Sequence, residues 1–194
     1  MIVSKITGII VKIQPHQELD SRVTVFSLEK GKITVLAKGV RKITSRRSGH
    51  LDLFHHVHME IEESASALPR RYLREVGSQY TARTLQRRPE SFAAACVIAH
   101  FLIHSLPEDT PQPRLFALTQ KTFEALNSER LPRDVLFTYF LKALKLLGYL
   151  PPVLPKTGLR PLLARTLHTI DPMLHLNARR TLGMFSIFSS TRSS

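Results

Sequence analysis

The first third of the chain alternates between apolar and polar residues with a period of two, which is typical of half-buried β-strands. The first predicted strand carries on one face Lys5, Thr7, Ile9, Val11 and Ile13, and on the other Ile6, Gly8 and Ile10. A second strand is predicted over residues 21–28 and a third over residues 33–37. Between these two strands, Gly31 favours a tight hairpin turn with a positive φ.

Residues 38–49 lack apolar periodicity and predict a loop. Alternation resumes over residues 53–62, with one face made of Leu53, Val57, Met59 and Ile61 and the other of His56, His58, Glu60 and Glu62. Residues 71–79 predict a fifth strand. Short antiparallel strands that bury one face and join through basic loops predict a small barrel, and the OB fold is the common barrel of this kind that binds nucleic acids.

From about residue 89 the apolar residues adopt helical spacing. Helices are predicted over residues 91–104, 114–126 and 132–149, and two more over residues 160–170 and 172–184 after a rigid, proline-rich connection at residues 150–161. Pro132 suits the first turn of its helix, and Gly148 suits the end. The sequence therefore predicts an α+β protein, in which a five-stranded OB-fold β-barrel at residues 1–80 precedes an α-helical domain at residues 81–194.

Positive charge is concentrated at the N-terminal end. The net charge is +13, and residues 1–50 hold ten Lys or Arg against three acidic residues, whereas residues 91–155 hold six against five. This asymmetry favours a polyanionic partner. Candidate phosphate-binding residues lie in or near the loop at 38–47 (Arg22, Lys32, Lys38, Arg41, Lys42, Arg46, Arg47), and a second arginine group follows (Arg70, Arg71, Arg74). The alternative for both sets is ordinary solvated charge.

No catalytic motif is present in the sequence. The 15 acidic residues are scattered, so we expect neither enzyme activity nor a cofactor. His56, His58 and Glu60 share one strand face and have the donor types of a zinc site, although a polar strand face is the simpler interpretation. A metal-dependent hydrolase built on these residues stays an alternative. His55, on the apolar face, is expected to be a hydrogen-bonded core histidine.

Cys96 is the one cysteine of the sequence, and it falls in the apolar run of residues 92–103. We therefore expect a buried, unreactive thiol, no internal disulfide and, without a recognisable secretory signal, a cytoplasmic location. The apolar run is too short to span a membrane, which takes about 20 residues.

Several segments resemble the bacterial recombination mediator family RecO: GIIVK at 8–12, ELD at 18–20, VTVFS at 23–27, AKGVRK at 37–42 and LKLLGYLP at 144–151. The resemblance implies an OB fold followed by a helical domain. It also implies binding of single- and double-stranded DNA, annealing of complementary strands, and help in loading RecA onto strands coated by single-strand-binding protein. The implied partners are RecR and the acidic C-terminal tail of single-strand-binding protein, at the bacterial nucleoid. A basic groove on the helical domain would suit that tail, and Arg114, Lys142 and Lys145 are candidates without a motif match.

The chain departs from the family pattern in one respect. Many relatives carry CxxC pairs after the GYLP segment, but residues 153–158 contain no cysteine. Because Cys96 is alone, a structural zinc held by four thiolates is excluded and no metal site is expected. Two other binding functions stay open from the sequence: an RNA-binding OB-fold protein, and a basic adaptor for an acidic protein tail.

Overall fold

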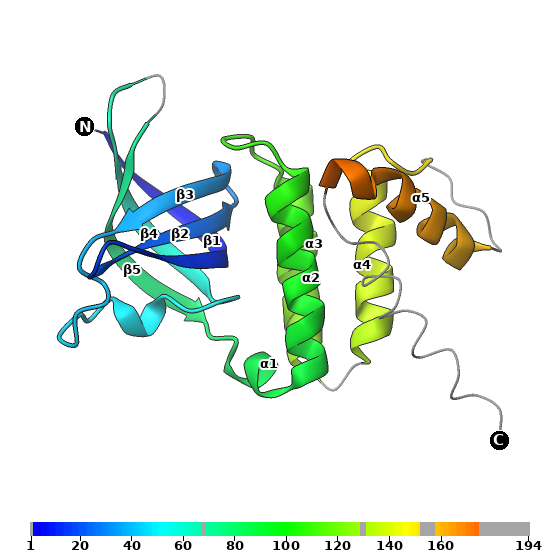
Figure 1. Ribbon diagram of the computed structural model, residues 1–194, viewed down its shortest axis with the longest axis horizontal. Helices are drawn as coiled ribbons and strands as arrows, with labels where there is room; N and C mark the ends of the chain where they lie inside the picture. The colour runs from blue at the N-terminus through cyan, green and yellow to red at the C-terminus, as the bar shows by residue number, and fades with distance from the viewer. Residues whose placement is uncertain (1, 67–68, 129–130, 152–157, 175–194) are drawn as a thin grey trace.

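Five strands form a closed barrel, and α-helices follow it in the chain (Figure 1). The computed structural model describes residues 2–66, 69–128, 131–151 and 158–174. The strands are β1 (Ile2–His16), β2 (Asp20–Ser27), β3 (Gly31–Ala37), β4 (His56–Glu63) and β5 (Arg71–Tyr80). They run in the order β1-β2-β3-β5-β4 around the barrel, with β3 and β5 as the parallel pair. The predicted α+β class with an N-terminal OB-fold barrel is confirmed.

The two faces of β1 serve two different cores. Ile6 and Ile10 point into the barrel, while Ile9 and Val11 pack toward the helices. Val11 is the extra residue of a β-bulge, because the register with β2 shifts between Ile10 and Lys12. The bulge moves Ile13 to the barrel interior, so its predicted place beside Ile9 is wrong.

A similar correction applies ahead of β4. Leu53 lies before the strand begins at His56 and packs against the helices rather than beside Val57 inside the barrel. Its predicted place on the Val57 face is therefore wrong. Period-two alternation holds only where the backbone is a regular strand.

The helical part begins directly after β5. Its helices are α1 (Arg83–Arg87), α2 (Pro89–Ser105), α3 (Pro113–Asn127), α4 (Pro132–Leu146) and α5 (Leu159–Leu174), and a short 3-10 helix η1 (Ser48–His50) lies earlier, between β3 and β4. Proline opens α2, α3 and α4, where its missing N–H breaks no helical hydrogen bond. Gly148 follows α4 with a φ of +80°, as the sequence predicts. None of the described helices is both long and apolar enough to cross a membrane.

Two predictions about the helices are wrong. α5 continues to Leu174, so the expected break between residues 170 and 172 is absent; the rest of the predicted helix at 172–184 lies outside the described residues. Cys96 is exposed rather than buried, because Ala94, Ala95 and Ile98 form the packed side of α2. Nearby atoms still desolvate the sulfur and raise the pKa of the Cys96 thiol.

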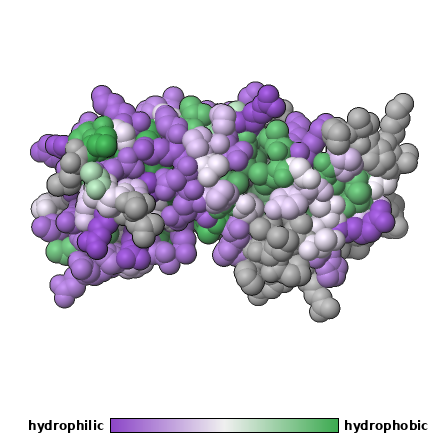
Figure 2. All heavy atoms as spheres, turned by 90° about the horizontal axis from the view of Figure 1, so that it is seen from above, coloured by the Kyte–Doolittle hydropathy of each residue, from purple (hydrophilic) through white to green (hydrophobic). Residues whose placement is uncertain are grey.

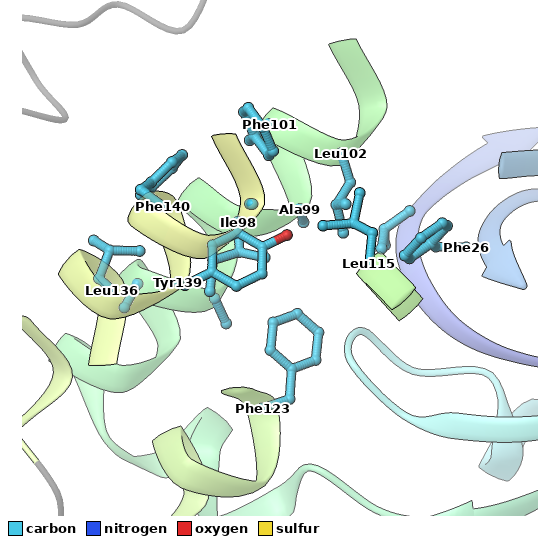
Figure 3. Packing of buried hydrophobic residues seen from close by; sticks show 14 of the residues in the cluster. Phe26, Ile98, Ala99, Phe101, Leu102, Leu115, Phe123, Leu136, Tyr139 and Phe140 are labelled. Atoms are coloured by element: carbon cyan, nitrogen blue, oxygen red, sulfur yellow. The ribbon is translucent and has the colours of Figure 1, made fainter. Parts of the chain in front are cut away.

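One apolar core joins the barrel to the helices. Phe26 of β2 meets Phe116 of α3 edge-to-face with ring centroids 5.7 Å apart. Phe54 meets Phe92 of α2 at 5.5 Å and Phe123 of α3 at 5.3 Å in the same manner. Figure 3 shows this core continuing from Phe26 through the helices, with the labelled side chains Leu115, Leu102, Ile98, Tyr139 and Phe140.

Polar contacts hold the loop between α2 and α3 against the β2–β3 hairpin. The Lys32 ammonium donates to the backbone oxygen of Ile103 at 2.6 Å, and the backbone N–H of Asp109 donates to the Lys32 oxygen at 3.1 Å. The Asp109 carboxylate also pairs with Arg71 of β5. Barrel and helices are therefore fixed to each other by backbone and ionic contacts as well as by apolar packing.

Gly31 is required at this junction. It takes the predicted positive φ, +70°, and an added Cβ would lie 2.0 Å from the backbone oxygen of Thr110. We expect Gly31→Ala to lower the free energy of unfolding by about 1–3 kcal/mol from backbone strain, and by more where the Thr110 loop must move. Gly49→Ala is the matched control, because its added Cβ meets no atom within 4 Å. Urea unfolding of both variants measures the difference, and equal stabilities would contradict the close approach.

Candidate nucleic-acid interface

The loop that connects β3 to η1 is anchored at its first half. Val40 is buried in the barrel core. The backbone N–H of Gly39 donates to the Asp20 carboxylate at 2.7 Å, and that of Arg41 donates to the Leu19 oxygen at 3.0 Å. These contacts hold the loop against the β1–β2 turn, and Figure 1 shows it projecting on the side of the barrel away from the helices.

Arg47 anchors the second half of the loop. Its Nη2 donates to the backbone oxygen of Lys38 at 2.9 Å, and its Nη1 donates to those of Leu73 and Arg74 at 3.1 and 3.3 Å. A planar guanidinium suits this fork, because its donors are fixed in one plane. Arg47, predicted from the sequence to contact phosphate, thus holds the loop to β5.

The exposed cations of the loop lie next to those on the outer surface of β2, β3 and β5. Arg22 pairs in register with Leu36 of β3, which pairs with Tyr72 of β5, so the three share the outer face. The Lys38 ammonium lies 4.6 Å from the centre of the Tyr72 ring. We name as the basic face the exposed residues Arg22, Lys38, Arg41, Lys42, Arg46 and Arg74.

Few acidic groups neutralise the basic face. Within the described residues its one ion pair joins Arg74 to Glu60, with a nitrogen–oxygen distance of 3.7 Å. The half-buried Asp20 carboxylate accepts a hydrogen bond from the Gly39 N–H. The face therefore presents a positive field with donors available to an anion.

Three of the predicted DNA-binding residues lie elsewhere. Arg71 is buried, and its guanidinium pairs with Glu63 at 2.6 Å and with Asp109. Lys32 is held by the Ile103 oxygen, and burial lowers the pKa of its ammonium. Arg70 is exposed in the β4–β5 turn and comes before the β5 residues Leu73 and Arg74, to which Arg47 of the loop is bonded. Lys32 and Arg71 are accordingly tied to contacts inside the protein.

The Glu63 carboxylate balances two cations at this end of the barrel. Lys30 donates to one of its oxygens at 2.7 Å, and Arg71 donates to the other. Burial acts to raise the pKa of Glu63, but the hydrogen bonds from Lys30 and Arg71 outweigh it, and the pKa is lowered. The ionised carboxylate is thus the stable form, and Arg71 has a structural partner.

The candidate tail-binding residues share one end of a helical hairpin. Lys142 and Lys145 are exposed near the end of α4, and Arg114 is exposed at the start of α3. Because a short link joins α3 to α4 and the two helices pack together, residue 114 lies at the same end as residue 145. Leu146 and Tyr149 are exposed beside the lysines. The exposure of these apolar neighbours could not be predicted from the sequence, since core leucines have the same spacing.

The histidines of β4 have separate partners rather than a common centre. His58 Nδ1 lies 3.1 Å from the Thr7 hydroxyl, and Glu60 pairs with Arg74. No group of three His, Cys, Asp or Glu side chains within reach of one metal occurs among the described residues. His55 is buried as predicted, but in the described part of the chain neither ring nitrogen has a hydrogen-bond partner, so the expected hydrogen bond is not seen there.

His56 lies between the barrel and α3. Its ring centre is 5.9 Å from that of Phe116 and 6.3 Å from that of His58. Burial lowers the pKa of His56 most, and the positive charge of His58 lowers it further; Glu124 of α3 and Glu29 of the β2–β3 turn act against this. The neutral ring is thus the form that the folded protein favours.

Two family models match the chain, one in its N-terminal part and one in its C-terminal part. The family model described as Recombination protein O N terminal matches residues 1–71, and the one described as Recombination protein O C terminal matches residues 86–153. A DNA repair protein RecO of Frankia casuarinae is 31% identical over 143 residues, which cover 73% of this chain and 58% of that protein. A DNA repair protein RecO of Desulfitobacterium hafniense is 30% identical over 144 residues, or 74% of this chain and 51% of that protein.

A third similar protein, the DNA repair protein RecO of Syntrophobacter fumaroxidans, is 24% identical over 151 residues, or 78% of this chain and 59% of its own length. The chain thus matches between about half and three fifths of the length of these curated relatives.

The lowered pKa of His56 predicts how stability depends on pH. Below the ordinary histidine pKa of about 6.5 the unfolded chain binds a proton that the folded chain resists, so unfolding becomes easier as pH falls. We expect His56→Gln to lose less thermal stability than the wild type between pH 7.5 and 5.5. His168→Gln, at an exposed position of α5, is the control and should behave as the wild type. Equal losses in all three proteins would refute the role of His56.

Proposed function

Since the chain belongs to the RecO family of DNA repair proteins, we propose that it binds single- and double-stranded DNA and acts as a mediator of homologous recombination. The observation that carries the proposal is the basic face, whose cations are exposed and nearly free of acidic partners in the described chain. In this proposal the phosphate backbone is the ligand, and no covalent step is needed.

The chemistry of the basic face supports electrostatic rather than base-specific binding. Lysine and arginine neutralise phosphates and release counterions, which gives affinity without regard to sequence. Tyr72 is an aromatic residue next to the basic face, and the Lys38 ammonium already lies over its ring. A series of aromatic platforms for base stacking is therefore not part of the proposal.

Strand annealing follows from the same charges. Two complementary strands repel each other through their phosphates, and cations held on a rigid surface lower that repulsion. The anchors of the loop, Asp20, Val40 and Arg47, keep the charges in place, so less conformational freedom is lost on binding. We propose this as the route by which the protein anneals DNA.

The helical domain is our candidate for partner binding. Lys142 and Lys145 stand beside the exposed side chains of Leu146 and Tyr149, a combination that suits a peptide with both acidic and apolar residues. We propose that this surface receives the acidic C-terminal tail of single-strand-binding protein. Cooperation with RecR in loading RecA, and a location at the nucleoid, are further parts of the proposal that rest on the family alone.

Two other binding functions are separated by competition. If the protein were an RNA-binding OB-fold protein, unlabelled RNA would displace labelled single-stranded DNA at a lower concentration than unlabelled DNA of the same sequence does. A basic adaptor would bind an acidic peptide tightly and DNA only at low salt. The family membership favours the DNA function over both.

The basic face predicts a steep salt dependence of DNA binding. Six phosphate contacts give a log–log slope of affinity against salt near −4 for a single strand. Reversing two charges in Arg41→Glu/Lys42→Glu should weaken binding more than tenfold at low salt and reduce the slope by about 1.4. Fluorescence anisotropy of labelled single-stranded DNA across a salt series measures both quantities.

The matched control is Lys121→Glu/Arg165→Glu, which makes the same charge change at exposed positions of α3 and α5. Its affinity should stay within about twofold of the wild type at moderate salt, where distant charges are screened. If both double variants lost affinity equally, net charge rather than the basic face would bind DNA. Arg47 is left unchanged in this test because its loss would also release the loop.

The helical surface makes a separate prediction. Lys142→Glu/Lys145→Glu should weaken binding of a labelled acidic-tail peptide of single-strand-binding protein by at least about tenfold, because two attractive charges become repulsive. Affinity for free DNA should change little. If this variant bound the peptide as well as the Lys121→Glu/Arg165→Glu control does, the proposal that the tail binds at this surface would be refuted.

A further inference from the structure

An isoleucine stands fully exposed among the cations of the loop. Ile43 has a relative solvent exposure of 104%, whereas Ile2, the next most exposed large apolar residue described, has 64%. Single exposed apolar residues are common on proteins, so exposure alone decides nothing. The setting of Ile43 is different, because Arg41 and Lys42 precede it, Arg46 follows, and all three are exposed.

The loop around Ile43 is anchored on both sides. Val40 fixes one side in the barrel core, and Arg47 fixes the other to Lys38, directly after β3, and to β5. Within the loop, the backbone N–H of Lys42 donates to the Gly39 oxygen at 3.3 Å, and that of Ser45 donates to the Lys42 oxygen at 2.9 Å. The branched side chain of Ile43 is itself stiff at χ1. An apolar group held in this way does not need to be ordered again when a ligand arrives.

We propose that Ile43 is a wedge that contacts the faces of nucleobases while the neighbouring cations hold the phosphates on either side. When the cations bind a polyanion, they bring the neighbouring apolar side chain against an accessible apolar part of that ligand. In nucleic acids, the accessible apolar part is the face of an unstacked base. Isoleucine serves elsewhere as an apolar wedge between base steps. The ligand class is therefore nucleic acid with open bases: a single strand, a frayed end or a gap.

Intact duplex DNA would use the basic face without the wedge. Its bases are stacked, and opening a step costs a few kcal/mol. Ile43 thus gives the protein a preference for open strands over duplex, although both offer the same phosphates. This preference rests on the proposed DNA-binding function and specifies which form of DNA the loop selects.

The test uses the whole chain and a single strand that carries 2-aminopurine, whose fluorescence reports base stacking. Ile43→Ser should bind this strand about tenfold more weakly, because the apolar area that isoleucine would bury against a base is lost. Its slope of affinity against salt should be unchanged, because no charge is altered. The change in 2-aminopurine fluorescence on saturation should largely disappear, and affinity for duplex should stay as in the wild type.

Two further variants sharpen the comparison. Ile43→Leu keeps an apolar side chain and should restore both affinity and the fluorescence change. Ile2→Ser, at the exposed start of β1, makes the same chemical change away from the loop and should behave as the wild type.

The outcomes separate the wedge from the wider function. If Ile43→Ser matches the wild type while Arg41→Glu/Lys42→Glu loses affinity, the wedge is refuted and the proposed DNA binding stands. Weaker binding with an unchanged fluorescence signal also refutes base contact. If the wild type does not bind DNA at low salt, the proposed function fails and the wedge with it.

Discussion

The apolar contact between one face of the barrel and helices α2 and α3 is the interaction on which the rest of the structure depends. The barrel fills its own interior, but Ile9, Val11, Phe26 and Phe54 point outward and would be exposed without the helices. Because these side chains are buried against the helices, that side of the barrel is not available to a ligand. Ligands of the barrel are left with the rest of its surface, and the loop at residues 38–47 projects on the side away from the helices (Figure 1). On the side seen in Figure 2 the barrel half is mostly hydrophilic, while apolar side chains reach the surface more often over the helices.

A second constraint is that three carboxylates at or near the barrel are used in contacts within the protein. Asp20 accepts from the loop backbone, Glu63 pairs with Lys30 and Arg71, and Asp109 pairs with Arg71. Each is satisfied by a contact that builds the fold. Among the described residues, no ion pair neutralises the cations of the loop. Concentrated charge of one sign destabilises a compact domain unless a polyanion binds to it. One set of charged residues thus stabilises the fold, and another set, the loop cations, gives the surface its positive charge.

Much of the barrel could be predicted from the sequence, because alternation and turn residues are local signals. The predictions failed where a distant element intervened. The bulge at Val11 reverses the side on which Ile13 lies, and nothing in the alternation of β1 marks it. Arg71 looks like its exposed neighbours Arg70 and Arg74 in the sequence, yet partners from β4 and from the α2–α3 loop bury it. Cys96 lies in a run that is apolar on every side, so the run could not indicate which residues face the solvent.

The same reasoning explains why the candidate site is simple in its chemistry. If the protein acts on strands of any sequence, as we propose, it cannot depend on hydrogen bonds to base edges, because such bonds select sequence. In the proposed function, phosphate contacts from Arg41, Lys42 and Arg46 would avoid this selection. The proposed apolar contact from Ile43 would avoid it too, since every base has an apolar face. Rigid anchoring of the loop then has a clear purpose: the energy of a few unspecific contacts is spent on binding rather than on ordering the chain.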